Sequence, residues 1–354
     1  MSQSSKVLRK LSSSEVAKQN REYVDKRRKG LITSLKTKYS KLNSSLMGGL
    51  EWDTIMCISA LSGAGKSTLS KTIRDSMVTL NTNQKFKQYI FNFEMLAHQQ
   101  IGRSIVSDAD IDMRNLYSVD EPLTDEQFKA LDIYYKQLAE RDVSFIEVPN
   151  TPEVIVNSLL HYWETECKDT DHTIVYEIDH ALLVKGRTGQ SEKERIDELM
   201  YLLVDAKKYI ASKGGHSVGI VLSQMNREIK DVTRRHSPDL HRPDTSCLFG
   251  ASSIEQCSDY ILFSHIPARL GISCYTENRL PTRMSVEGKI LQIPYFELVK
   301  QRSGASDLTI PLWNRLNRFD FDEMDKDVFD RLRKDFIDSD CQKIPQIEAQ
   351  SKLF

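Results

Sequence analysis

The residues between 60 and 68 are the ones whose types and spacing most clearly indicate chemistry. They read Ala-Leu-Ser-Gly-Ala-Gly-Lys-Ser-Thr, after an apolar run at 55–58 and before a helical pattern over 69–78. A strand, a glycine-rich turn ending in Gly-Lys-Ser and a helix form a loop whose backbone N–H groups bind phosphates. The sequence therefore predicts an ATP site formed by Ser62, Gly63, Ala64, Gly65, Lys66, Ser67 and Thr68.

Two side chains of this loop have separate roles in such a site. Lys66 would reach the β and γ phosphates, and Ser67 would hold Mg²⁺ through its hydroxyl group. The first glycine of the usual pattern is Ala60 here, which costs little where the backbone needs no positive φ. The alternative is an ordinary glycine- and serine-rich turn that happens to contain Gly-Lys-Ser.

Polar side chains also follow several apolar runs that read as strands. In open α/β sheets, ligands bind beyond the carboxyl ends of the strands. Asp179 suits a Mg²⁺-holding position, and Glu94 could orient and polarise the attacking water. Gln224 could sense the γ-phosphate, and Lys300 with Arg302 could supply positive charge to the transition state. Taken alone, each has a plainer interpretation as a helix N-cap, a solvated turn or a surface charge.

Strands and helices alternate along the middle of the chain. Strands are expected at 55–59, 88–93, 143–148, 173–178, 217–222, 260–263, 295–299 and 308–312, and helices at 69–78, 95–104, 152–166 and 192–213. This alternation predicts an α/β fold with a mostly parallel sheet flanked by helices.

Charge is distributed unevenly over the 354 residues, although the net charge is only −1. Residues 1–45 carry twelve lysines and arginines against three acidic residues, and residues 320–354 carry ten acidic against six basic residues. A basic segment favours nucleic acid or an acidic protein surface as a partner, and a solvated helix face is the alternative. A polar helix over 14–29 has too few apolar residues to be stable without a docking partner.

Bulk composition excludes several classes of protein. No apolar run approaches the roughly 20 residues of a membrane helix, and the N-terminus has no secretory pattern. The six cysteines, at positions 57, 167, 247, 257, 274 and 341, lack metal-binding spacing. They are expected to be reduced thiols in a cytoplasmic protein.

The order of the motifs resembles the C-terminal ATPase domain of replicative DNA helicases of the bacterial DnaB type. The family's phosphate-binding loop often has alanine in place of the first glycine, as at Ala60. The other matching motifs are Phe93-Glu94-Met95 with Gln100 and Arg103, Ile178-Asp179-His180, Leu222 to Arg227, Arg242-Pro243, Ile254-Glu255-Gln256 with Asp259, and Lys300 to Gly304. The resemblance covers residues 30–320.

The resemblance implies a RecA-like P-loop NTPase that uses ATP and Mg²⁺ and forms a homo-hexameric ring on single-stranded DNA. Lys300 and Arg302 would act as a finger on the nucleotide of the neighbouring subunit. It also implies a primase, polymerase or helicase loader as partner, no membrane, and the cytoplasm of a bacterial cell, with a phage as an open source. We expect three segments: a basic arm with a linker helix over 1–30, the ATPase domain over 31–319 and an acidic tail over 320–354.

The loop over 227–253 is the expected DNA-binding element, with phosphate charge rather than base stacking dominating. Its nucleic-acid contacts are expected at Arg234, Arg235, Arg242, Gly250 and Ser252. A flexible solvated loop is the alternative. The chain departs from the family here, because Cys247 to Ser252 replaces an Asp-Leu-Arg-Glu-Ser run. Segment 266–294 is also longer than is typical, and the family's N-terminal helical domain is missing from this sequence.

Three functions fit these motifs. The first is an ATP-driven, ring-forming DNA helicase. The second is a RecA-like ATPase that acts as a recombination mediator or loader without unwinding. The third is a degenerate ring subunit that serves as a DNA-bound scaffold, against which the complete set of Lys66, Glu94, Asp179 and Arg302 argues.

Overall fold

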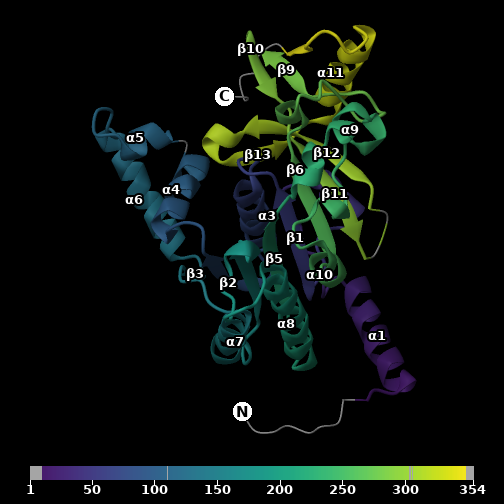
Figure 1. Cartoon of the computed structure of the whole chain (residues 1–354). Coiled ribbons are helices and arrows are strands. Elements are labelled where there is room, and N and C mark those ends of the chain that lie inside the picture. The colour runs from purple at the N-terminus through teal and green to yellow at the C-terminus, as the bar shows by residue number, and fades with distance from the viewer. Residues whose placement is uncertain (1–9, 110, 303, 305, 348–354) are drawn as a thin grey trace.

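One nine-stranded sheet runs through the part of the chain that the computed structural model describes, residues 10–109, 111–302, 304 and 306–347 (Figure 1). In hydrogen-bonded order its strands are β13 (Asp320–Glu323), β12 (Leu308–Arg315), β11 (Tyr295–Gln301), β6 (Tyr260–His265), β1 (Thr54–Ala60), β5 (Ser217–Gln224), β4 (His172–Asp179), β2 (Lys85–Asn92) and β3 (Val143–Ile146). From β6 to β3 all neighbours are parallel, whereas β11, β12 and β13 are antiparallel. The predicted α/β fold with a mostly parallel sheet is confirmed.

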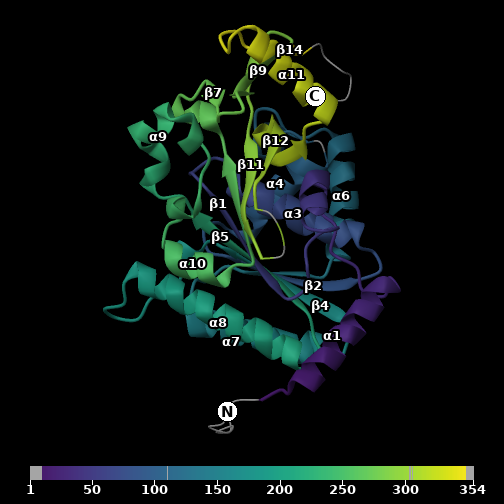
Figure 2. The same cartoon turned by 90° about the vertical axis from the view of Figure 1, so that its right-hand side faces the viewer.

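The central strands are apolar because both faces of the sheet are covered. One face packs on α7 (Pro152–Tyr162), α8 (Glu192–Ser212) and α10 (Ala251–Cys257). The other packs on α3 (Lys66–Leu80) and on a connector that contains α2 (Ser40–Ser45). Figure 2 shows α7 and α8 on one side of the sheet and α3 on the other. The connector contributes Leu35, Tyr39, Leu42 and Leu50 to the core, all fully buried.

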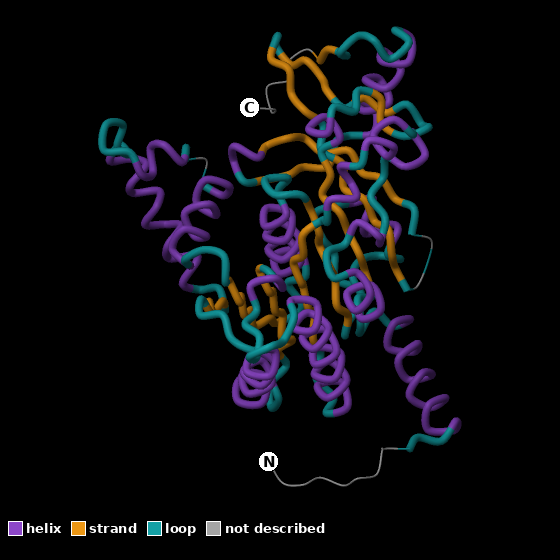
Figure 3. Tube along the Cα trace, viewed as in Figure 1, coloured by secondary structure: helices purple, strands orange, loops and turns teal. Residues whose placement is uncertain are grey.

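Two helical segments project from opposite sides of this body, as the tube in Figure 3 also shows. On one side, α4 (Ala97–Asp108), α5 (Met113–Tyr117) and α6 (Asp125–Ala139) share a small core of their own. On the other side lies α1 (Ser13–Arg28), which begins at a capping box between Ser12 and Glu15 and has no buried residue. The helix predicted at 14–29 is therefore present and lacks an apolar partner among the described residues.

The end of the chain packs against the long insert that follows β6. The insert carries β7 (Cys274–Tyr275), β8 (Leu280–Pro281), β9 (Arg283–Val286) and β10 (Lys289–Gln292), and the chain end carries α11 (Lys326–Asp338) and β14 (Gln346–Ile347). Strand β14 pairs with β9, and Phe329 and Leu332 of α11 join the apolar cluster of the insert. We call these two segments, 266–294 and 326–347, the accessory body.

The segment expected as an acidic tail contributes, over its described residues, a strand of the main sheet and a packed helix. Part of its negative charge faces the basic connector, because Lys38 Nζ lies 2.8 Å from Asp320 Oδ1 and 2.8 Å from Asp322 Oδ1. The opposite charges of the two chain ends therefore meet in the folded protein. None of the helices in the described ranges is both long and apolar enough to cross a membrane.

Candidate nucleotide site and nucleic-acid loop

The predicted phosphate-binding loop connects β1 to α3. Gly65 has a φ of 83°, and a Cβ there would lie 2.4 Å from the ring of Phe321, so only glycine fits. Helix α3 is held on the sheet from beneath, since buried Glu177 accepts hydrogen bonds from Ser70 Oγ (2.6 Å) and Arg74 Nη1 (2.8 Å). The start of α3 and its orphan N–H groups are therefore fixed over the carboxyl edge of the parallel strands.

Beside the loop, the structure brings the predicted Mg²⁺ ligands together. Ser67 Oγ donates a hydrogen bond of 2.8 Å to Asp179 Oδ2, and Lys66 Nζ lies 3.6 Å from Asp179 Oδ1. Asp179 is almost fully buried, and its Oδ1 atom has no hydrogen-bond partner in the described residues. A hydroxyl and a buried carboxylate oxygen suit a hard cation, so these residues fit Mg²⁺.

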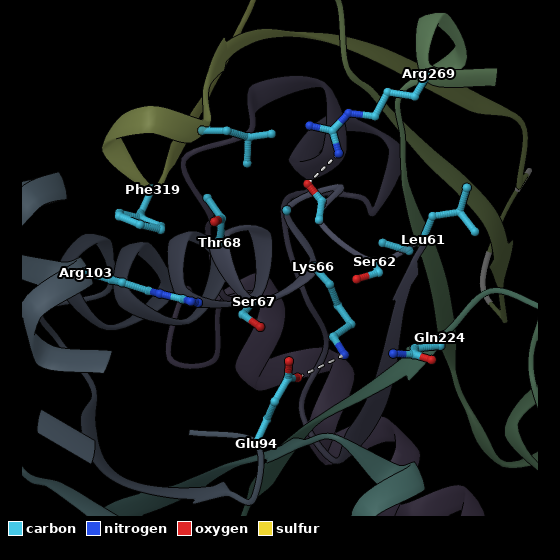
Figure 4. A pocket seen from close by; sticks show the side chains of 14 residues that line it. Leu61, Ser62, Lys66, Ser67, Thr68, Glu94, Arg103, Gln224, Arg269 and Phe319 are labelled. Atoms are coloured by element: carbon cyan, nitrogen blue, oxygen red, sulfur yellow. Dashed lines mark hydrogen bonds and ion pairs between the residues drawn. The ribbon is translucent and has the colours of Figure 1, made fainter. Parts of the chain in front are cut away.

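Glu94 stands across the site from the loop (Figure 4). It follows β2, and its carboxylate is half-exposed, 4.0 Å from Lys66 Nζ and 3.7 Å from His180 Nε2. Burial, together with the Lys66 charge, lowers the pKa of His180 to about 4, so this imidazole is neutral at pH 7. The carboxylate thus faces the cavity as a charged group that can polarise a water molecule.

A cavity of about 310 Å³ lies between these groups. Gln224, at the end of β5 and opposite Ala60 in the register of the sheet, lines it as expected. Of the predicted phosphate-binding residues, Ser62, Gly63, Gly65, Lys66, Ser67 and Thr68 line the cavity, whereas Ala64 is buried beneath it.

Four further residues that line the cavity were not predicted as ligands. The Arg103 guanidinium, on α4, lies over the Phe319 ring at 5.1 Å from its centroid, and Leu316 is beside them. Arg269, in the turn Pro267–Leu270, donates a hydrogen bond of 2.7 Å to the carbonyl of Gly63. Only Arg103 had a signal in the sequence, as part of the family motif after Glu94.

Lys300 and Arg302 do not join this site, and the prediction that they lie at the same sheet edge is wrong. Strand β11 runs antiparallel to β6, so its carboxyl end lies at the edge where the parallel strands begin. There Lys300 Nζ donates to the carbonyl of Glu255, and Arg302 Nε lies 2.7 Å from Asp259 Oδ1. These two cations are therefore available only to a nucleotide bound by another subunit.

The basic loop after β5 is folded on itself rather than free. It contains α9 (Val232–His236). Arg234 binds the carbonyls of Leu240 and Arg242 and the carboxylate of Asp244. Arg242 Nε lies 2.9 Å from Glu297 Oε2, a carboxylate with no exposure to solvent. Because carboxylates neutralise both arginines, the expectation that Arg234 and Arg242 offer their charge to DNA is corrected to a role in holding the loop.

The other three predicted nucleic-acid residues are placed differently. Arg235 is half-buried, and its backbone carbonyl lies 3.1 Å from His241 Nε2. Gly250 caps α10 with a φ of 72°, and Ser252 is exposed in the first turn of that helix. Two exposed cations at the start of the loop, Arg227 and Lys230, have no ion-pair partner among the described residues and line an open groove.

Comparison with known proteins identifies relatives of this architecture. The model of the DnaB-like helicase C-terminal domain matches residues 34–320. No curated protein matches the chain. One solved structure, described as an ATPase domain, has a TM-score of 0.71 at 17% identity, covering 90% of this chain and 100% of its own. A DnaB-like replicative helicase, described with its interactions with primase, has a TM-score of 0.68 at 18% identity, covering 91% and 69%.

Proposed function

Because the chain belongs to the family of the DnaB-like helicase C-terminal domain, we propose that it is the motor of a replicative helicase, a ring of six subunits that moves along single-stranded DNA. Family membership makes it an ATP-hydrolysing helicase with a RecA-like fold. The observation that carries the proposal is the cluster of Lys66, Ser67, Glu94 and Asp179 around one cavity. A forked duplex, one strand of which is released only with ATP, is the test, with oligomer mass measured alongside. ATP turnover without strand release would favour a mediator or loader.

In the proposed mechanism each residue acts on one part of ATP. Lys66 would exchange its contacts with Asp179 and Glu94 for contacts with the β and γ phosphates. Ser67 and Asp179 would hold Mg²⁺, which neutralises phosphate charge when bound. Glu94 would orient the attacking water and accept its proton, and Gln224 would donate a hydrogen bond to the γ-phosphate.

We propose that Arg103 and Phe319 hold the base of the nucleotide. A flat guanidinium and an aromatic ring that already lie face to face offer a stacking surface at the rim of the phosphate cavity. Arg103→Ala is expected to weaken ATP binding about tenfold, a loss of about 1.4 kcal/mol. Titration with ATP and with inorganic tripolyphosphate measures this. An equal loss for both ligands would assign Arg103 to the phosphates instead.

The proposed ring requires a head-to-tail contact, and the two projecting helical segments supply one. The basic helix α1 exposes Val16 and Val24, whereas α6 on the opposite side exposes Phe128 and Ile133 among acidic residues (Figure 1). Since the two surfaces face away from each other in one subunit, each is available to a neighbour, and such a contact repeats into a ring when its rotation closes.

Deleting residues 1–29 is therefore expected to convert the oligomer into monomers that still bind ATP. Light scattering measures the mass, and nucleotide binding reports that the ATPase body is folded. Phe128→Asp should have the same effect from the other side of the contact. An intact oligomer with weakened DNA binding would instead show that the arm is a DNA-binding tail.

We propose Arg227 and Lys230 as phosphate contacts for single-stranded DNA, in place of the internally bound Arg234 and Arg242. Replacing both with alanine is expected to reduce the slope of log affinity against log salt by roughly 2, about one for each lost contact. Lys168→Ala with Lys213→Ala is the matched control, because these exposed lysines lie where β4 and β5 begin, at the opposite edge. An unchanged slope would place the DNA elsewhere.

A further inference from the structure

Two cysteines meet in the accessory body. Cys274 in β7 and Cys341 just after α11 are 67 residues apart in the sequence, and their sulfur atoms lie 3.5 Å apart. Both are partly exposed, whereas the other four cysteines, at positions 57, 167, 247 and 257, are buried. Among the cysteines of the chain, this pair alone combines proximity with access to solvent.

An arginine distinguishes the two sulfurs. Arg279 Nε lies 3.1 Å from Cys341 Sγ, and its Nη2 lies 2.6 Å from Asp340 Oδ1. A guanidinium beside a sulfur favours the thiolate, which is the nucleophilic form. Burial, with the neighbouring Cys341 sulfur, raises the pKa of Cys274 to about 11, so Cys274 stays a thiol at neutral pH. The geometry therefore gives Cys341 the part of attacking sulfur and Cys274 that of resolving sulfur.

We propose that Cys274 and Cys341 form an oxidisable dithiol that closes to a disulfide when a peroxide is present. The Cys341 thiolate attacks one oxygen of hydrogen peroxide, the O–O bond breaks, and proton uptake gives a sulfenic acid and a hydroxide ion. The Cys274 sulfur then attacks the sulfenic sulfur, its proton leaves with the displaced hydroxyl as water, and the S–S bond forms. Two thiols are oxidised by two electrons, and one peroxide is reduced to two waters.

The new bond would join segments that now hold together by packing alone. It would tie β7 of the insert to the end of α11, and so close a loop that contains β11, β12 and β13. Neither cysteine lines the nucleotide cavity. Oxidation should therefore stabilise the accessory body against unfolding, through the restricted unfolded chain, without changing the groups that bind ATP.

The test treats the full-length protein with one equivalent of hydrogen peroxide and maps its peptides. The expected result is one linked pair, Cys274 to Cys341, with loss of two hydrogen atoms, reversal by dithiothreitol and slower proteolysis near α11. Cys274→Ser and Cys341→Ser should each abolish the link, while the control Cys257→Ser should keep it. Arg279→Gln should slow its formation several-fold.

Two outcomes would overturn the proposal. One is oxidation of Cys341 to the sulfinic acid with both cysteines still unlinked. The other is a disulfide that involves another cysteine or a second chain. Circular dichroism of each serine variant, before oxidation, separates loss of the link from loss of the fold, and Cys274→Ala serves as a second variant.

Discussion

Replacing Glu94 with glutamine is expected to slow ATP hydrolysis by about two to four orders of magnitude, the usual contribution of a positioned general base. The substitution keeps the shape of the side chain and removes the charge that faces the cavity, 4.0 Å from Lys66 Nζ. ATP binding should persist, because the loop, Lys66 and Asp179 are untouched. Steady-state turnover, measured beside equilibrium binding of ATP, tests this separation.

Lys66→Ala is the contrasting variant, since it removes the main positive charge for the phosphates and should abolish binding as well as turnover. Glu277→Gln is the matched control, because that glutamate lies exposed between β7 and β8, away from the cavity. Near-normal turnover by the Glu94→Gln protein would remove Glu94 from the role of base.

Arg302→Ala is expected to lower turnover by about three orders of magnitude or more, the effect typical of an arginine finger. Arg302 is half-exposed and lies at the sheet edge opposite its own phosphate-binding loop, so its effect must be exerted on a neighbour's nucleotide. Mixing Arg302→Ala with Lys66→Ala subunits should then restore activity, because roughly a quarter of the interfaces in an equal random mixture regain both parts.

Lys207→Ala controls for structure at this position. Lys207 Nζ lies 2.7 Å from Asp259 Oδ2, and Arg302 contacts the other oxygen of the same carboxylate. If Arg302 served only to hold Asp259, both variants should lose turnover alike and mixing should restore neither. Failure of the mixture, although mixed oligomers form, would contradict a finger that acts in trans.

The sequence by itself determined the features that depend on neighbouring residues. The strand before Ala60, the glycine that Gly65 must be and the helix from Lys66 are local, because periodicity and backbone conformation are properties of a few consecutive residues. The placement of Asp179, Glu94 and Gln224 around the loop followed as well, since parallel strands bring their carboxyl ends to one edge of the sheet.

Only the tertiary structure decided the contacts between distant segments. The reversal of β11 moved Arg302 to the far edge, and buried Glu297 claimed Arg242, a partner 55 residues away. The stack of Arg103 on Phe319 and the approach of Cys274 to Cys341 are of the same kind. A residue's type says that it needs a partner, for a buried charge or an open ring face. Which partner it finds depends on strand direction and on how elements pack, and no local pattern encodes either.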